Sequence, residues 1–349
     1  MSHTTTNSTT APTKTLAGSI TGFARRPEFG ALIGALAVYA FFAVAGGAPF
    51  LAPGGSASWL NVASELGIIA LLVALVMIAG DLDLSVGSVL AGSSMVLAIS
   101  SGYYGLPTIV GILLAIGFGV GVGVINGILV TRTNLPSFVV TLATNFAVVG
   151  LTLGFTRLLV GSTAVSFQAD PWAKFLFGEL IDGKFETAII WWVIIALAVG
   201  WVLYQSPWGN WIYAIGGDVV SARAAGIPVE KVRISLFAGS GFAAAFVGVL
   251  QTCLYNGSQV AMGQSFVFNS IIAVVIGGVL LTGGYGSPIG VILGTLTFAI
   301  VNQGIYYTGW NADWASLILG ILLLIAVLAN NSFRRMALTG GDTKSKGKK

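Results

Sequence analysis

Long apolar runs, interrupted by short polar or glycine-rich segments, dominate the chain. Asp, Glu, Lys and Arg are all absent from five stretches, which are Leu84 to Thr131, Thr133 to Thr156, Thr187 to Gly217, Ile234 to Ala312 and Trp314 to Phe333. A helix that crosses a bilayer needs roughly 20 apolar residues, so each stretch holds at least one spanning helix and the longest holds about three. No strand-like alternation of polar and apolar residues divides the runs, which favours helices over a transmembrane barrel.

The pattern predicts an all-α integral membrane protein with about ten transmembrane helices. We expect these helices at about 29–46, 59–80, 84–101, 107–130, 136–158, 188–204, 233–253, 268–282, 288–308 and 313–331. Together they form a membrane domain over 29–332, with a long external loop at 161–186 and a long internal loop at 205–232. A disordered N-terminal tail, 1–28, and a basic C-terminal tail, 333–349, are expected to flank this domain.

Composition supports a bilayer as the solvent. Of 349 residues, 56% are hydrophobic and 8% are charged, whereas a soluble domain carries about 25% charged residues. The chain has one cysteine, Cys253, and one histidine, His3, which excludes an internal disulfide and argues against a metal site. The net charge of +4 comes from basic residues scattered over tails and loops, so we expect no nucleic-acid partner.

The distribution of basic residues predicts the orientation of the chain. If both termini are cytoplasmic, 13 of the 16 Lys and Arg residues lie in the tails and internal loops, and only Arg157, Lys174 and Lys184 lie outside. Positive charge is enriched on the cytoplasmic side of membrane proteins. We therefore expect ten spans in an inner membrane, with both ends inside.

A weak internal repeat relates the two halves of the chain. The segment Gly80 to Ala91 (GDLDLSVGSVLA) aligns with Gly283 to Gly294 (GGYGSPIGVILG), and the same shift brings the first span onto the seventh. Six spans separate the units, so the repeat would be parallel. It predicts discontinuous helices near Gly80 and Gly283, where transporters with internal repeats tend to build their sites.

The first of these breaks carries two carboxylates, Asp81 and Asp83, followed by Ser85. One interpretation is a polar turn in which Asp83 and Ser85 cap the next helix by binding its free N–H groups. The alternative is a direct role in the transport path. Other polar residues fall inside predicted spans, where they should face the bundle interior: Glu65, Asn126, Thr141, Thr144, Asn145, Asn269, Asn302 and Gln303. Each could bond to a neighbouring helix or contact an uncharged substrate rich in hydroxyl groups.

The internal loop contains a short predicted helix. Ser221, Ala222 and Arg223 follow Asp218, and Gly226-Ile227-Pro228 should end the helix. From the pattern alone, this is a charged cytoplasmic segment. The chain has no GxxxxGK[ST] loop, so it has no ATP site of that type.

Several segments together resemble the sugar-type ABC permeases, which include importers of ribose, xylose and arabinose. Gly80 to Ser88 is similar to the family's G-G-I-D-L-S-V-G-S signature, and four further segments agree in order: Gly119 to Val130, Phe138 to Leu142, Tyr213 to Val229 and Ala273 to Gly304. The resemblance spans roughly residues 30 to 332. Asp81 replaces the usual glycine, Asp218 a frequent asparagine, and Val149 an arginine found in several members.

The resemblance implies a permease subunit of a bacterial ABC importer for a sugar or polyol, with no catalytic residues and no cofactor of its own. It implies that Asp218, Ser221, Ala222, Arg223, Gly226, Ile227 and Pro228 form a coupling helix that docks on a cytoplasmic ATPase, where ATP is used. The translocation path or gate would include Asp81, Asp83, Ser85, Thr141, Asn145, Asn269, Asn302 and Gln303. The other expected partners are a periplasmic sugar-binding protein, a second permease subunit and the bilayer. The rival hypothesis is a proton- or sodium-coupled transporter that uses Asp81, Asp83 or Glu65.

Overall fold

The computed structural model describes residues 27–133 and 135–339. The predicted tails fall mostly outside this part of the chain, at 1–26 and 340–349. Ten apolar helices form the body of the described protein: α2 (Pro27–Leu51), α3 (Pro53–Ile78), α4 (Val86–Leu97), α5 (Thr108–Arg132), α6 (Ser137–Val160), α8 (Ala188–Gln205), α11 (Val229–Tyr255), α12 (Phe266–Ile276), α13 (Pro288–Gly304) and α14 (Trp314–Thr339). The prediction of an all-α membrane protein is therefore confirmed.

Eight helices in the described ranges are long and apolar enough to cross a membrane, and one of them joins α4 to the π-helical turn η1 (Ala98–Tyr103). Two others, over Phe266–Ile276 and Trp314–Ala326, are apolar but shorter. The exact number of ten spans stays a prediction. Helix α12 ends six residues before the expected boundary at 282, and α14 continues past the expected 331 to Thr339.

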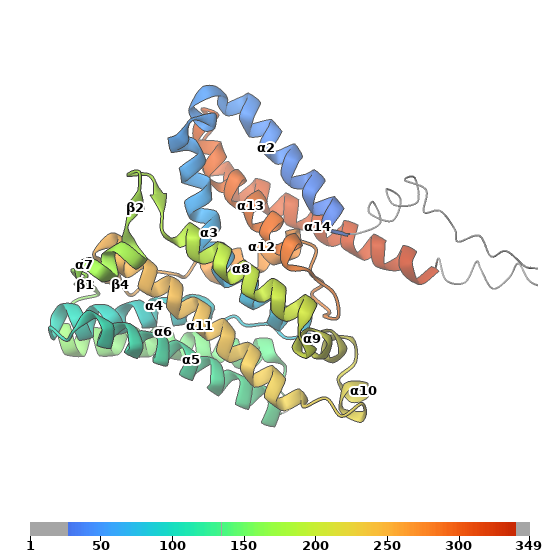
Figure 1. The fold of residues 1–349 in the computed structure, drawn as a ribbon, viewed down its shortest axis with the longest axis horizontal. Coiled ribbons are helices and arrows are strands. Elements are labelled where there is room, and N and C mark those ends of the chain that lie inside the picture. Colours follow the sequence, from blue (N-terminus) through green and yellow to red (C-terminus); the bar gives the residue numbers. More distant parts are fainter. Residues whose placement is uncertain (1–26, 134, 340–349) are drawn as a thin grey trace, which may run out of the picture.

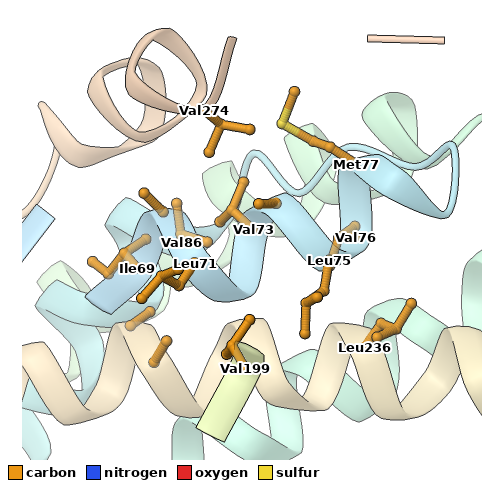
Figure 2. Close-up of a cluster of buried hydrophobic side chains, with 14 of the residues drawn as sticks. Ile69, Leu71, Val73, Leu75, Val76, Met77, Val86, Val199, Leu236 and Val274 are labelled. Atoms are coloured by element: carbon orange, nitrogen blue, oxygen red, sulfur yellow. The ribbon is translucent and has the colours of Figure 1, made fainter. Parts of the chain in front are cut away.

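Helix α3 is the centre of the bundle. Its spanning window is 83% buried, compared with 22% for α6 and α8, as expected of a helix that is apolar on all sides. Figure 2 shows Ile69, Val73 and Met77 of α3 in the buried cluster, together with Leu236 of α11 and Val274 of α12. The short apolar helix α12 thus packs directly on the core.

Two groups of helices flank α3 and α8 (Figure 1). Helices α4, α5, α6 and α11 pack on one another in one group, while α2, α12, α13 and α14 pack in the other. The most extensive helix packing is between α5 and α11, where Gly119, Gly123 and Gly127 present a groove of small residues to α11. A Cβ atom at any of the three would collide with α11 backbone, so the glycines permit close packing of the two helices.

The connections divide between the two ends of the bundle. At one end, which we call the hairpin end, lie the strands β1 (Ala164–Ser166), β2 (Leu180–Ile181), β3 (Phe185–Glu186) and β4 (Gly257–Gln259) and the turns α7 (Pro171–Ala173), η2 (Lys174–Gly178) and η3 (Ile305–Tyr307). Strand β1 pairs antiparallel with β4, and β2 with β3. The opposite end, the break end, carries α9 (Pro207–Gly217) and α10 (Val219–Ala224), so the long internal loop is largely helical.

Candidate functional site

Two helix interruptions lie at the break end. We call 79–85, between α3 and α4, the first break, and 277–287, between α12 and α13, the second break. The second residue of each is a left-handed glycine, Gly80 (φ 88°) or Gly278 (φ 88°). In both, the amide of the next residue reaches back to a carbonyl five residues earlier: Asp81 to Val76 at 3.1 Å and Val279 to Val274 at 3.3 Å. This is the Schellman arrangement, which satisfies carbonyls left open at a helix end.

The discontinuous helices expected at these two places are therefore present, with one correction. The glycine that ends α12 is Gly278, not Gly283, because the helix stops at the first left-handed residue. Gly283 has another role. It packs against the first break so closely that a Cβ atom on it would lie 2.7 Å from the Cα of Gly80. The parallel repeat itself stays a prediction.

The two breaks touch each other and the end of α9. The backbone amide of Gly284 donates a hydrogen bond to the carbonyl oxygen of Ile78 at 2.8 Å. Gly216 of α9 lies against this bond, since a Cβ atom there would collide with both the Ile78 carbonyl and the Gly284 nitrogen. Three backbone segments far apart in sequence thus meet at one point, which we call the glycine junction (Ile78, Gly216, Gly283 and Gly284).

Hydroxyl groups of α6 hold the first break from the side. Ser137 Oγ accepts a hydrogen bond from the Leu82 amide at 3.0 Å. Thr141 Oγ1 lies 3.1 Å from the Leu84 amide and 3.2 Å from the Leu82 carbonyl. Extended backbone inside a bundle needs such partners, because unpaired buried amides and carbonyls are costly. Thr141 is fully buried, and in this conformation its hydroxyl is hydrogen-bonded to the backbone of the first break.

Asp83 is buried at the end of a polar chain that crosses three elements. Thr144 Oγ1 donates to Asn126 Oδ1 at 2.6 Å, Asn126 Nδ2 donates to Ser85 Oγ at 2.9 Å, and Ser85 Oγ donates to Asp83 Oδ1 at 2.6 Å. The expected cap on α4 was wrong in detail. Asp83 binds the amide of Ser85 itself, and Ser85, the N-cap residue, makes no side-chain bond to the helix because its hydroxyl is engaged by Asp83 and Asn126.

The second carboxylate of the first break forms an ion pair with α11. Arg233 Nε donates to Asp81 Oδ2 at 2.6 Å, and Arg233 Nη2 donates to Asp81 Oδ1. The side chains are only 17% and 5% exposed. A forked, buried contact of this kind fixes geometry as well as charge, so the first break is fastened to the first turns of α11.

The segment identified as a coupling helix projects from the break end as α10 (Figure 1). Asp218 caps it by accepting a hydrogen bond from the Ser221 amide at 2.6 Å. Hydrogen bonds from the Ser221 side chain and backbone hold the pKa of Asp218 below its usual range. The helix ends as predicted, since Gly226 is left-handed (φ 80°) and Ile227 reaches back to the Ala222 carbonyl at 3.1 Å, and Pro228 then precedes α11.

Only one side chain of α10 is buried. Ala222 packs on the core, while Ser221 and Arg223 are exposed, as is Gly226 beyond the helix; Val220 is 73% exposed. The exposed face is therefore a small surface of Val, Ala and Ser side chains with one guanidinium group. On each side of α10 the chain contacts a break: α9 through Tyr213 and Gly216, and α11 through Arg233.

The structure gathers some of the predicted path residues and separates others. Asp81, Asp83, Ser85 and Thr141 come together at the first break, with Asn126 and Thr144 beside them. Asn145 is half-buried on α6. Asn269, Asn302 and Gln303 lie on α12 and α13, where Gln303 Nε2 donates to Asn302 Oδ1 at 2.9 Å; Asn302 and Gln303 end α13 on the side away from the breaks. Their role in a path stays a prediction.

Two residues of the site, Tyr213 and Gly216, are not among the predicted site residues. They lie on α9, where the sequence analysis predicts an internal loop. Tyr213 donates its hydroxyl to the carbonyl of Gly286 in the second break at 2.7 Å. A signal was present in the sequence. Trp208, Trp211, Ile212 and Ile215 recur with the i, i+3, i+4, i+7 spacing of an amphipathic helix. No three His, Cys, Asp or Glu side chains gather as metal ligands anywhere in the described ranges.

Comparison with known proteins gives consistent matches. Residues 55–327 match the family described as the branched-chain amino acid transport system permease component. The probable ABC transporter permease protein y4mJ of Sinorhizobium fredii is 36% identical, over 78% of this chain and 81% of its own length. The ribose import permease RbsC of Bacillus subtilis is 33% identical (80% and 85%), and the fructose import permease FrcC of Rhizobium meliloti is 30% identical (80% and 78%). No solved structure matches the chain.

Proposed function

The chain belongs to the family of branched-chain amino acid transport system permease components and is a transmembrane permease subunit of a bacterial ABC importer, and we propose that its substrate is a sugar. Two relatives that align over about four fifths of this chain are permeases for ribose and for fructose. The polar residues of the spans are mainly amides and hydroxyls, which suit a neutral substrate with many hydroxyl groups.

The arrangement of the break end supports a specific route for the energy of ATP. Helix α10 would dock on a separate ATPase subunit and move when that subunit closes. Its two neighbours in sequence contact the breaks, α9 through the glycine junction and α11 through the Asp81–Arg233 ion pair. The observation that carries this proposal is the placement of α10 between these two contacts.

Because the contacts are made by backbone and by a buried ion pair, a displacement of α10 cannot be absorbed by flexible side chains. It would shift the end of α3 and the second break together. Both breaks precede core helices, α4 and α13, so their movement would change the packing of the two helix groups. Such a movement would be the physical basis for alternating access, in which one repeat or bundle rocks against the other.

The remaining parts of the importer follow from the family. We propose a cytoplasmic ATP-binding cassette ATPase at the break end, a sugar-binding protein at the hairpin end and a second permease subunit beside this one. The break end would face the cytoplasm, since it carries Arg132, Arg223, Lys231 and Arg233, in keeping with the positive-inside rule. Both termini would then lie inside. ATP would be bound by the partner, and this chain would need no cofactor.

The rival, an ion-coupled transporter, is not favoured by the relatives or by the break. Asp81 is already neutralised by Arg233, and Asp83 is engaged by Ser85. The test is ATP hydrolysis by the ATPase reconstituted with this subunit in liposomes. Ligand-loaded binding protein should raise the rate several-fold over the ligand-free protein. An unchanged rate in a complex that assembles normally would contradict the proposal.

A further inference from the structure

Two acidic residues, the buried Glu65 and the half-buried Glu186, lie at the hairpin end, away from the glycine junction. Glu65 is on α3 and is 7% exposed; its Oε2 accepts a hydrogen bond from Gln251 Nε2 at 2.8 Å. Its other oxygen, Oε1, is buried without a hydrogen-bond partner in the described protein, and so is Oε2 of Glu186. The two carboxyl groups interact electrostatically. Each therefore has one oxygen whose hydrogen-bonding capacity is unused.

Asn61 explains why the two carboxyl groups meet. Its Nδ2 donates to the Lys184 carbonyl at 2.9 Å, and its Oδ1 accepts from the Glu186 amide at 3.0 Å. Asn61 precedes Glu65 by four residues, so both lie on one face of α3. The amide of Asn61 thus docks the β2–β3 hairpin on the same face, and the side chain of Glu186 is brought to Glu65.

Among the residues that the structure describes, no cation forms a salt bridge with this pair. Lys184 is 3.6 Å from Asp182, and Lys174 of η2 donates to the carbonyls of Cys253 and Leu254. Tyr255 of α11 is the other titratable group that interacts with both carboxyl groups. Helices α12 and α13 carry no titratable side chain, and that of α8, Tyr204, lies near its opposite end. Two adjacent carboxylates here would repel each other, and the hydrogen bond from Gln251 to Glu65 would offset only part of the lost solvation.

We propose that Glu65 and Glu186 bind a single shared proton near neutral pH, and that this proton fastens the β2–β3 hairpin to α3. Glu65, the more deeply buried acid, carries the proton on Oε1 and donates it to Oε2 of the ionised Glu186, so that both unused atoms are paired. The proton comes from water at the hairpin end, and the pair keeps one negative charge. The inference does not depend on which sugar the importer carries.

Burial also favours the protonated form at Glu186, which lies outside the spans. Burial raises the pKa of Glu186 to about 7, so even the group nearer to solvent holds its charge weakly. Loss of the shared proton would leave two interacting negative charges, and the hairpin would be repelled from α3 as pH rises.

Infrared spectroscopy of the purified subunit tests the proposal directly. At about pH 7.5, Glu65→Gln should remove the C=O band of a protonated carboxyl group and leave the carboxylate bands unchanged. The control Glu179→Gln, an exposed acid of the same segment, should remove carboxylate intensity only. If Glu65→Gln instead removes carboxylate intensity, Glu65 is ionised, as it would be with a bound sodium ion, and the proposal is wrong.

A second measurement uses the unaltered protein and does not depend on any variant. After correction for the intrinsic rate, amide hydrogen exchange at Glu186 and Thr187 should accelerate as pH rises from about 5 to about 9, by up to about tenfold per pH unit for one linked proton. Glu65→Gln keeps a hydrogen-bond donor at every pH, so its hairpin should remain protected throughout. Constant protection in the unaltered protein would overturn the proposal.

Discussion

The carbonyl oxygen of Ile78 accepts a hydrogen bond from the amide of Gly284 at 2.8 Å, although 206 residues separate them. Ile78 is the last residue of α3, and its carbonyl is one of those that a helix end leaves open. The second break therefore satisfies one of the backbone carbonyls that are left open at the end of α3. The ends of the two interrupted helices cannot move independently while this bond is intact.

Gly216 should be essential because it lies against that bond. Gly216→Ala introduces a Cβ atom into the Ile78 carbonyl and the Gly284 nitrogen, and overpacking of this kind costs about 1–3 kcal/mol. We expect a lower melting temperature of the purified subunit and loss of ATP-driven uptake. Gly217→Ala is the matched control, since nothing lies within 4 Å of a Cβ atom there. Equal effects of Gly216→Ala and Gly217→Ala would contradict a specific role for Gly216 at the glycine junction.

The Asp81–Arg233 pair predicts strong non-additivity. Asp81→Asn or Arg233→Gln alone leaves an uncompensated charge in the bundle and should destabilise the subunit by about 3–5 kcal/mol. The double variant removes both charges and should be markedly more stable than either single variant. Thermal melting of all four proteins in detergent completes the double-mutant cycle. Additive losses would show that the two side chains do not depend on each other.

The exposed face of α10 predicts a coupling defect without a folding defect. Arg223→Glu, or Gly226→Asp just beyond the helix, should abolish substrate-stimulated ATP hydrolysis while membrane insertion stays normal. Gly226→Asp also strains a left-handed residue, at about 1–2 kcal/mol, so Arg223→Glu is the cleaner variant. Arg132→Glu makes the same charge change at an exposed site of the break end and should retain stimulation. Normal stimulation of ATP hydrolysis in Arg223→Glu would contradict the docking of α10 on the ATPase.

The hairpin end predicts a pH dependence of stability. Burial raises the pKa of Glu186 from an ordinary value of 4.5 to about 7. Between these values the folded protein binds a proton that the unfolded chain does not, so this contribution to stability is complete below about pH 4.5 and is lost as pH rises to about 7. Melting temperatures over this range should fall less steeply in Glu186→Gln than in the unaltered protein or in Glu179→Gln. Identical slopes would contradict the prediction.

Local patterns in the sequence were sufficient to predict the apolar helices and the short helix of the internal loop, but not α9. The apolar runs locate the spans because a bilayer requires long uninterrupted apolar helices. The short helix α10 was predicted from Asp218 at its start and Gly226-Ile227-Pro228 beyond its end, and the structure has both the cap and the left-handed glycine. These features depend on neighbours in the chain, which the sequence displays directly.

Contacts between distant segments could not be predicted in the same way. Arg233 is 152 residues from Asp81, and nothing local indicates that they pair. The sequence also offered several glycines for the second break. Only the structure distinguishes Gly278, which ends α12, from Gly283, which packs on Gly80. Thr141 stays a candidate for the path, and only the structure shows that its hydroxyl bonds to the backbone of the first break.

Transport in proteoliposomes tests the central claim most directly. The subunit is reconstituted with its ATPase, and uptake of a radiolabelled sugar is measured with ligand-loaded binding protein on one side and ATP on the other. We predict that uptake requires the ATPase, the binding protein and ATP, and that it persists when proton and sodium gradients are collapsed. Uptake by this subunit alone, driven by an ion gradient and independent of ATP, would contradict its role as an ABC permease.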